Sequence, residues 1–262
     1  MNLGNDLCFL LTIPPKMKRK YEPHNLKGDE KASYVAHMFA QISRRYDLTN
    51  TVLTGGIHHQ WRRLTAQLAA QGLEGNALDI ATGTGDLAFA LQKQEGILST
   101  VGVDFVPEMI YLATQKAEQR HLSKEIRFLQ GDALELPFKD DSFICASSAF
   151  GMRNVSDIPS AVSEMKRVVK PNGRVVVLEI TPFRKNGIFP RLFRFYFHRL
   201  VPIIGKALTG HNKAYTYLPR SVDLFPNADL FASMMEESGL KNVRYHKVGF
   251  GALAIHVGEK SV

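Results

Sequence analysis

Three acidic residues, Asp79, Asp104 and Asp132, lie in or directly after short apolar stretches that are typical of buried strands. The first is followed by residues 82–86, Thr-Gly-Thr-Gly-Asp, which predict a tight turn, and a helix is expected to start near Leu87. A helix that starts beside a glycine turn offers unpaired N–H groups to a ligand carboxylate or phosphate. A carboxylate at a strand end about twenty residues further on can bind the two hydroxyls of a ribose. The spacing therefore predicts a nucleoside pocket.

The glycine turn is weak evidence by itself. Its order, Gly-Thr-Gly-Asp, lacks the third glycine of the dinucleotide-binding pattern, because position 88 is alanine. The alternative is a sheet whose strand ends carry carboxylates for structural reasons only, and three such ends in succession favour the pocket. For Asp86 we expect a helix N-cap rather than a ligand contact.

The elements that would position these residues follow from the alternation of apolar and amphipathic segments, which indicates parallel strands joined by helices. Strands are expected at residues 77–81, 100–104, 126–130, 143–149, 174–180, 242–248 and 251–258, and helices at residues 86–94, 107–121, 157–169 and 227–238. The short glycine link between the last two strands suits an antiparallel hairpin. The fold class is therefore α/β, with a doubly wound, Rossmann-like, mostly parallel seven-stranded sheet, an antiparallel C-terminal edge strand and a helical insertion at residues 182–225.

The N-terminal part is expected to cover the pocket. A flexible extension is predicted at residues 1–30, with Met17 as an alternative start, and a single domain at residues 31–260. Apolar residues on one face of residues 32–46 predict a helix that lies over the pocket. A loop at residues 47–56 and a second helix at residues 57–71 are expected to follow.

Composition limits the partners. The formal charge of +8 and the pI of about 9.4 suggest an anionic partner, either membrane lipid or nucleic acid, or else merely high solubility. RNA-binding motifs and zinc patterns are lacking, so no nucleic acid is expected. Two cysteines do not make a disulfide framework, which suits the cytoplasm. The insertion at residues 182–225 mixes basic and aromatic side chains. It is either a helical cap with solvated arginines or a surface that lies on anionic lipid, which would make the protein peripherally membrane-associated.

Two longer segments resemble those of a known family. Residues 46–61 (YDLTNTVLTGGIHHQW) look like the first signature of the menaquinone/ubiquinone C-methyltransferases, the UbiE/COQ5/MenG group, and residues 167–181 (RVVKPNGRVVVLEIT) look like the second. Residues 150–155 (FGMRNV) and 254–260 (AIHVGEK) fit the same family. The chain thus resembles a class I S-adenosylmethionine-dependent methyltransferase from about residue 31 to residue 260.

The resemblance implies S-adenosyl-L-methionine as the cofactor, bound at Thr84, Asp104, Asp132 and Ala133. Gly83 and Gly85 would admit the methionine and ribose portions, because glycine leaves the backbone bare. Asp104 would accept from both ribose hydroxyls, and Asp132 with the Ala133 N–H would bind adenine. Asp79 would reach the amino group of the methionine portion.

The resemblance also implies a prenylated quinol as the methyl acceptor. The ring carbon becomes a nucleophile when a neighbouring hydroxyl loses its proton, so a base and a positive charge near the oxyanion are wanted. We expect Arg153 to stabilise the anion and hold a water, with Asn154 and Asp47 as its catalytic partners. Substrate positioning or gating is expected of four residues: Tyr46, Asn50, His58 and Phe150. For His58 and for His256 we favour packing or support of neighbouring residues over catalysis.

The expected reaction is conversion of demethylmenaquinol to menaquinol. The alternatives are C-methylation of a 2-methoxy-6-polyprenyl-benzoquinol on the ubiquinone route and of a phytyl-naphthoquinol.

Ala149 departs from the family, which often has a serine contact there. No cluster has metal-ligand spacing, so no metal is expected. The sequence leaves the oligomeric state open, a homo-oligomer included.

Overall fold

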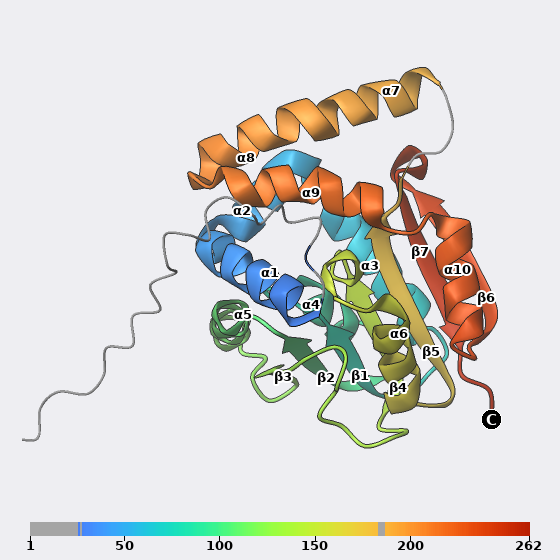
Figure 1. Cartoon of the computed structure of the whole chain (residues 1–262). Helices are drawn as coiled ribbons and strands as arrows, with labels where there is room; N and C mark the ends of the chain where they lie inside the picture. The colour runs from blue at the N-terminus through green and yellow to red at the C-terminus, as the bar shows by residue number, and fades with distance from the viewer. Residues whose placement is uncertain (1–25, 27, 183–186) are drawn as a thin grey trace, which may run out of the picture.

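The computed structural model describes residue 26, residues 28–182 and residues 187–262. Its centre is one seven-stranded sheet with the order β3-β2-β1-β4-β5-β7-β6 (Figure 1). The strands are β1 (Gly75–Ile80), β2 (Ile97–Asp104), β3 (Ile126–Gln130), β4 (Phe143–Ala149), β5 (Val169–Ile180), β6 (Lys241–Val248) and β7 (Leu253–Glu259). The first five are parallel, and β7 pairs antiparallel with both β5 and β6. The predicted fold class is confirmed, with the antiparallel pair at one edge and β6 outermost.

Helices cover both faces of the sheet. The flanking helices are α3 (His58–Ala70), α4 (Asp86–Gln92), α5 (Pro107–Gln119), α6 (Ile158–Val168) and α10 (Ala228–Glu237). Buried side chains of α3 and α4 pack with those of β1, β4 and β5 in one cluster. Those of α6 and α10 pack against the opposite face in another. Burial on both faces explains why β4 is buried along nearly its whole length and why its sequence does not alternate.

A third group of helices lies over the carboxyl ends of the parallel strands (Figure 1). It comprises α1 (Gly28–Ile42), α2 (Tyr46–Thr54), α7 (Ile188–Phe195), α8 (Val201–Thr209) and α9 (Asn212–Leu224). A separate apolar cluster joins Val35 and Met38 of α1 to Val201 of α8 and Tyr215 of α9. The predicted helical insertion is therefore present in its described part, and it packs on the N-terminal helices.

Two N-terminal expectations need correction. The predicted loop at residues 47–56 is instead the helix α2, which ends at Gly55 in the left-handed conformation. Its threonines favour other structures in isolation, but Thr51 and Thr54 donate to the carbonyls four residues earlier, and Tyr196 donates to the Leu53 carbonyl. Helix α1 starts at Gly28, earlier than predicted, and the rest of the expected flexible extension lies outside the described residues.

The insertion forms one long helical segment followed by a return helix. A π-helix, Tyr196–Leu200, joins α7 to α8, and Gly210 in the left-handed conformation ends α8. At the crossing with α9, a Cβ on Gly205 would lie 2.1 Å from the Tyr215 ring, so glycine is required for this close approach. Within the described residues no helix is both long and apolar enough to cross a membrane.

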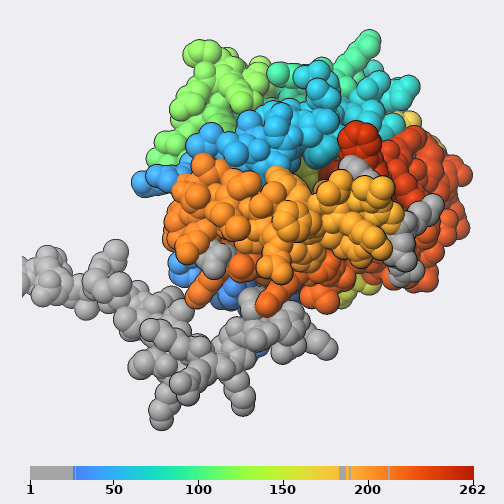
Figure 2. All heavy atoms as spheres, turned by 90° about the horizontal axis from the view of Figure 1, so that it is seen from above, coloured from blue at the N-terminus to red at the C-terminus, as the bar shows by residue number. Residues whose placement is uncertain are grey.

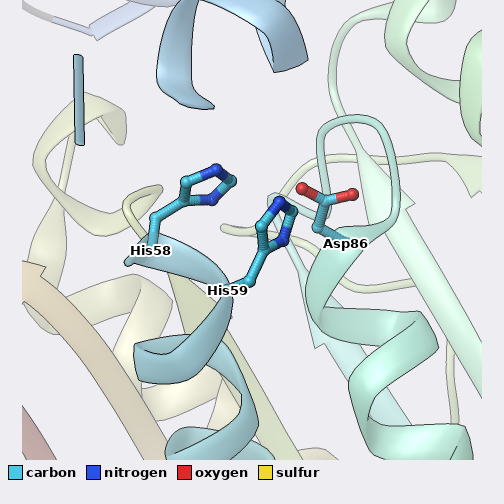
Figure 3. A group of neighbouring side chains, drawn as sticks. All are labelled: His58, His59 and Asp86. Carbon is cyan, nitrogen blue, oxygen red and sulfur yellow. The ribbon is translucent and has the colours of Figure 1, made fainter. Parts of the chain in front are cut away.

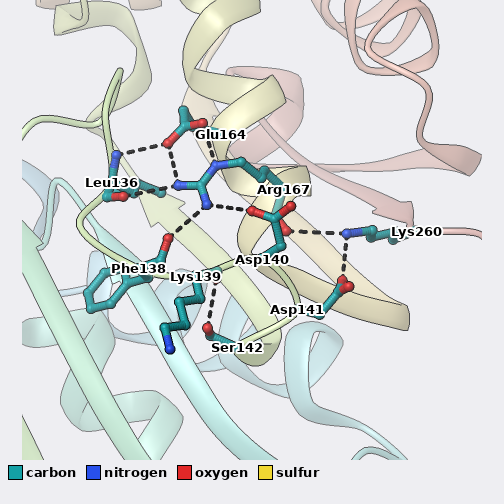
Figure 4. A network of polar contacts seen from close by, with 9 residues as sticks. All are labelled: Leu136, Phe138, Lys139, Asp140, Asp141, Ser142, Glu164, Arg167 and Lys260. Carbon is teal, nitrogen blue, oxygen red and sulfur yellow. Dashed lines mark hydrogen bonds and ion pairs between the residues drawn. The ribbon is translucent and has the colours of Figure 1, made fainter.

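The second signature segment begins with a structural network at the end of the sheet away from this cover (Figure 4). Arg167 donates to the carbonyls of Leu136 and Phe138 at 3.0 and 2.7 Å and to the carboxylates of Glu164 and Asp140. These carboxylates raise the pKa of Arg167 above its ordinary value. Arg167 therefore fixes the loop that leads into the amino end of β4.

Candidate active site

A cavity of about 1030 Å³, part of it open to solvent, lies between the carboxyl ends of the strands and α1. Apolar and polar side chains line it together, as they do in most cofactor and ligand sites. Nine of the predicted site residues line it: Tyr46, Asp79, Gly83, Thr84, Asp104, Asp132, Ala133, Phe150 and Asn154. Five do not: Asp47, Asn50, His58, Gly85 and Arg153. The strand ends thus converge on one cavity, as the sequence pattern predicts.

Asp104 at the end of β2 holds the glycine turn in place. Its two carboxylate oxygens accept from the N–H groups of Gly83 at 2.7 Å and Val106 at 2.9 Å. Burial raises the pKa of Asp104 above its ordinary value, although these N–H bonds act in the opposite direction. Each oxygen retains a further lone pair, so the carboxylate can position the turn and still accept from a ligand hydroxyl.

Asp79 on β1 is only half satisfied. One oxygen accepts from the Thr82 hydroxyl at 2.6 Å, and the other is buried without a hydrogen-bond partner in the described structure. Burial raises the pKa of this carboxyl to about 7. A buried carboxylate is stable only when donors or a positive charge compensate for lost water, so this oxygen is suited to a cationic group in the cavity.

Gly85 has a structural task rather than a place in the cavity wall. It is the N-cap of α4 at a φ of +88°, and a Cβ there would lie 2.7 Å from the Phe128 ring. The expectation that Asp86 caps the helix is wrong, because Asp86 is already the first helical residue. The Asp86 carboxylate lies 3.2 Å from the Lys116 ammonium. The positive charges of Arg62 and Lys116 lower the pKa of Asp86 although burial acts in the opposite direction.

Asp47 connects the cover to the glycine turn from outside the cavity. Its carboxylate accepts from the Thr84 hydroxyl at 2.5 Å and pairs with Lys116 of α5 at 2.5 Å. Tyr46, its neighbour on α2, lines the cavity, and burial raises the pKa of the phenol. Asn50 lies one turn further along α2 and hydrogen-bonds the Tyr46 side chain, which works against that rise.

Three potential metal ligands meet beside the cavity, although the sequence spacing gives no sign of them. Side-chain atoms of His58, His59 and Asp86 lie within 4.8 Å of one another (Figure 3). Burial is the largest cause that lowers the pKa of His58 to about 4. The cations Arg62 and Lys116 lie in the same cluster and lower it further. Two neighbouring positive charges oppose a metal cation, so we assign the cluster to the polar support of the cavity.

Arg62 is a site residue that the sequence analysis missed. It lies on α3, is buried and lines the cavity, with its guanidinium carbon 5.1 Å from the centroid of the Phe150 ring. It also contacts the Nδ1 atom of His58. The only local signal was a basic residue directly after Trp61 on a helix whose apolar residues cover the sheet, and such a residue is usually solvent-exposed.

Arg153 lies apart from the cavity. Its guanidinium pairs at 2.8 Å with the fully buried carboxylate of Glu179 and donates to the Phe150 carbonyl. It lines a second cavity with Lys31, Tyr217 and Arg220. Its bond to Phe150 supports the turn in which that residue adopts a φ of +63°. The adjacent Asn154 faces the main cavity, and its side-chain oxygen is buried without a partner in the described structure.

Comparisons with known proteins agree with this geometry. A model of the ubiE/COQ5 methyltransferase family matches residues 27–260. The chain is 45% identical over 223 residues to a demethylmenaquinone methyltransferase of Thermus thermophilus, covering 85% of this chain and 100% of that protein. It is 35% identical to a ubiquinone/menaquinone biosynthesis C-methyltransferase of Dinoroseobacter shibae, covering 90% and 94%.

Among solved structures, the chain is similar to a methyltransferase of Thermotoga maritima that is described as SAM-dependent and as a possible histamine N-methyltransferase. The TM-score is 0.59 with 20% sequence identity, over 86% of this chain and 99% of that one. At this identity the likeness shows the fold alone.

Asp79 makes the stability of the ligand-free protein depend on pH. Its folded pKa of about 7 exceeds the ordinary 3.8, so between these values the folded state holds a proton that the unfolded chain has released. Stability from this group is therefore lost as the pH rises toward 7. Asp79→Asn cannot ionise. We expect its free energy of unfolding to rise relative to that of the wild type by about 2 kcal/mol as the pH goes from about 5 to about 7. Urea unfolding at several pH values measures the difference, and a pH-independent difference would contradict the assignment.

Proposed function

Because this chain belongs to the ubiE/COQ5 methyltransferase family, we propose that it transfers a methyl group from S-adenosyl-L-methionine to a ring carbon of demethylmenaquinol, giving menaquinol. The single observation that carries the proposal is the convergence of the strand-end carboxylates Asp79, Asp104 and Asp132 on one cavity. They match the ammonium, the ribose hydroxyls and the adenine amine of that cofactor in the order in which it would extend along the strand ends.

The residues present fit the cofactor. The two oxygens of Asp104 can accept from the two ribose hydroxyls, and the Ala133 N–H with Asp132 can bind adenine. Val106 and Met109 supply apolar surface to the same cavity, which suits the faces of a purine. Gly83, at a φ of +56°, presents no side chain at the point where the ligand would pass.

The cofactor supplies an activated methyl group on its sulfonium, and the protein must align the acceptor and exclude water. The quinol hydroxyl next to the acceptor carbon would lose its proton, and the C–CH₃ bond would form as the S–CH₃ bond breaks. The ring carbon would then lose its own proton while the oxygen regains one, so that one proton is released overall. Asn154 and Tyr46 line the cavity with polar atoms suited to hold the quinol oxygens. The unpartnered oxygen of Asn154 can accept from a quinol hydroxyl.

We propose indirect roles for Arg153 and Asp47, which the sequence suggested as catalytic partners of Asn154. The guanidinium of Arg153 is already bonded to Glu179 and to the Phe150 carbonyl, so it would position Phe150 and Asn154 rather than contact the ring. Asp47 would hold α2 against the glycine turn through Thr84 and Lys116.

The proposed acceptor ring, a naphthoquinol, has one specific alternative. The relative from Dinoroseobacter shibae is named for both ubiquinone and menaquinone biosynthesis, so a polyprenyl-benzoquinol is the second candidate acceptor. The higher identity to the demethylmenaquinone methyltransferase of Thermus thermophilus favours the naphthoquinol.

Incubation of the purified protein with methyl-labelled S-adenosylmethionine and a panel of reduced precursors tests the reaction. The panel contains demethylmenaquinol, a 2-methoxy-6-polyprenyl-benzoquinol and a phytyl-naphthoquinol, and mass spectrometry locates the label. We expect label on a ring carbon of demethylmenaquinol at the highest kcat/KM. Binding of S-adenosylhomocysteine without methylation of any quinol would contradict the proposed acceptor class.

A prenylated acceptor also explains the outer surface of the insertion, which we propose lies on anionic membrane lipid. Ile188, Leu192, Phe195 and Ile203 are each more than half exposed, and the first three share the i, i+4, i+7 spacing of one helix side. Arg191, Arg194 and Arg199 are exposed on the same helical segment. Figure 2 shows α7 and α8 stretched across the face above the strand ends. Apolar groups rimmed by basic groups are suited to lipid headgroups.

Replacement of Arg191, Arg194 and Arg199 by glutamate should weaken binding to vesicles that contain anionic lipid, because it reverses three charges at this surface. The control replaces the exposed Arg63, Lys93 and Lys124 by glutamate, which changes the net charge equally but outside residues 182–225. We expect at least a tenfold loss in the first variant by vesicle sedimentation. Equal losses in both variants, or none in either, would contradict a role for the insertion.

A further inference from the structure

The cavity contains a buried positive charge without a counter-ion. Arg62 is 6% exposed, and among the described residues no carboxylate lies within 4.0 Å of its guanidinium. Asp79 and Asp86 line the same cavity and attract it electrostatically, but each has another partner: Thr82 for Asp79 and Lys116 for Asp86. A buried arginine is normally paired, because loss of hydration is otherwise uncompensated. An anionic group of a ligand is therefore suited to Arg62.

The direct contacts of the guanidinium are with neutral groups, the His58 ring and the Phe150 ring. His58 has a pKa lowered to about 4, so near neutral pH its Nδ1 atom accepts from Arg62. The Nε2 atom then carries the proton and can donate to the Thr51 hydroxyl at 3.2 Å, which in turn donates to the Asp47 carbonyl. This chain orients Arg62 without neutralising it, and guanidinium N–H groups remain for a second partner.

Asp79 presents the complementary charge in the same cavity. Its second carboxylate oxygen is buried without a partner, as described above. The lining of the cavity thus offers an unpaired acceptor on Asp79 and, on Arg62, guanidinium N–H groups without a carboxylate partner among the described residues. A free amino-acid group, with an ammonium and a carboxylate on one carbon, matches both.

We propose that Arg62 binds the carboxylate of the methionine portion of S-adenosylmethionine while Asp79 binds its ammonium. The inference rests on the proposed function, since it assigns a role within the cofactor site. Arg62 and Asp79 together would select a cofactor with an intact amino-acid end. Two charge-assisted hydrogen-bonded pairs formed out of water fix its orientation more strongly than neutral contacts would.

The test compares ligands with and without the amino-acid end. Isothermal titration calorimetry measures S-adenosylhomocysteine and 5′-methylthioadenosine, which lacks that end, on the wild type, Arg62→Gln and the control Arg63→Gln. Arg63 is the exposed neighbour on α3. We expect Arg62→Gln to weaken S-adenosylhomocysteine at least tenfold and to leave 5′-methylthioadenosine within twofold. Arg63→Gln should change neither affinity.

A second measurement on the wild type does not depend on how the variant folds. The carboxamide of S-adenosylhomocysteine, which has no negative charge, should bind at least tenfold more weakly than the acid. Three results would overturn the inference. They are equal affinities for acid and amide, equal weakening of both ligands by Arg62→Gln, or unchanged S-adenosylhomocysteine affinity with a lower kcat. The last result would assign Arg62 to the quinol oxyanion. Failure of the wild type to bind either nucleoside would instead contradict the proposed function itself.

Discussion

Burial of two carboxylates, Asp79 and Asp104, at the ends of adjacent parallel strands is the constraint on which the rest of the site depends. Such groups are unfavourable away from water unless donors compensate them. Asp104 obtains its donors from the backbone of Gly83 and Val106, so the glycine turn must pass directly over the strand end. Gly83 and Gly85 have positive φ, and Gly85 leaves room for Phe128. One oxygen of Asp79 has no hydrogen-bond partner in the described structure, which leaves part of its requirement to a ligand.

The cover of the site is tied to the same turn. Asp47 on α2 contacts Thr84, and Lys116 on α5 lies between Asp47 and Asp86. The apolar cluster of α1, α8 and α9 then extends this cover toward the exposed apolar side of the insertion. In the proposed function, the prenylated quinol approaches from that side and the polar cofactor binds at the strand ends. The proposed reaction thus joins an apolar and a polar ligand. The cover has exposed apolar side chains on its outer side, and the cavity beneath it has polar strand ends.

The sequence predicts correctly those structural features that depend on residues close together along the chain. Continuous apolar stretches that end in acids predict strands, and parallel strands bring Asp79, Asp104 and Asp132 to one edge. Prediction from sequence failed where tertiary contacts decide. Helix α2 was missed because its threonines find partners only in the folded structure. Arg62 was missed because sequence cannot show that an arginine is buried without a carboxylate. Asp86 was placed at the N-cap because the pattern favours aspartate there, whereas Gly85 occupies that position in the structure.

The central claim is that the carboxylate-bearing strand ends hold an adenosyl cofactor. A crystal structure of the complex with S-adenosylhomocysteine tests it most directly. Both ribose hydroxyls are predicted to donate to the Asp104 carboxylate, with adenine beside Asp132 and the Ala133 N–H. A nucleoside bound elsewhere on the protein, or a ribose that does not contact Asp104, would contradict the account.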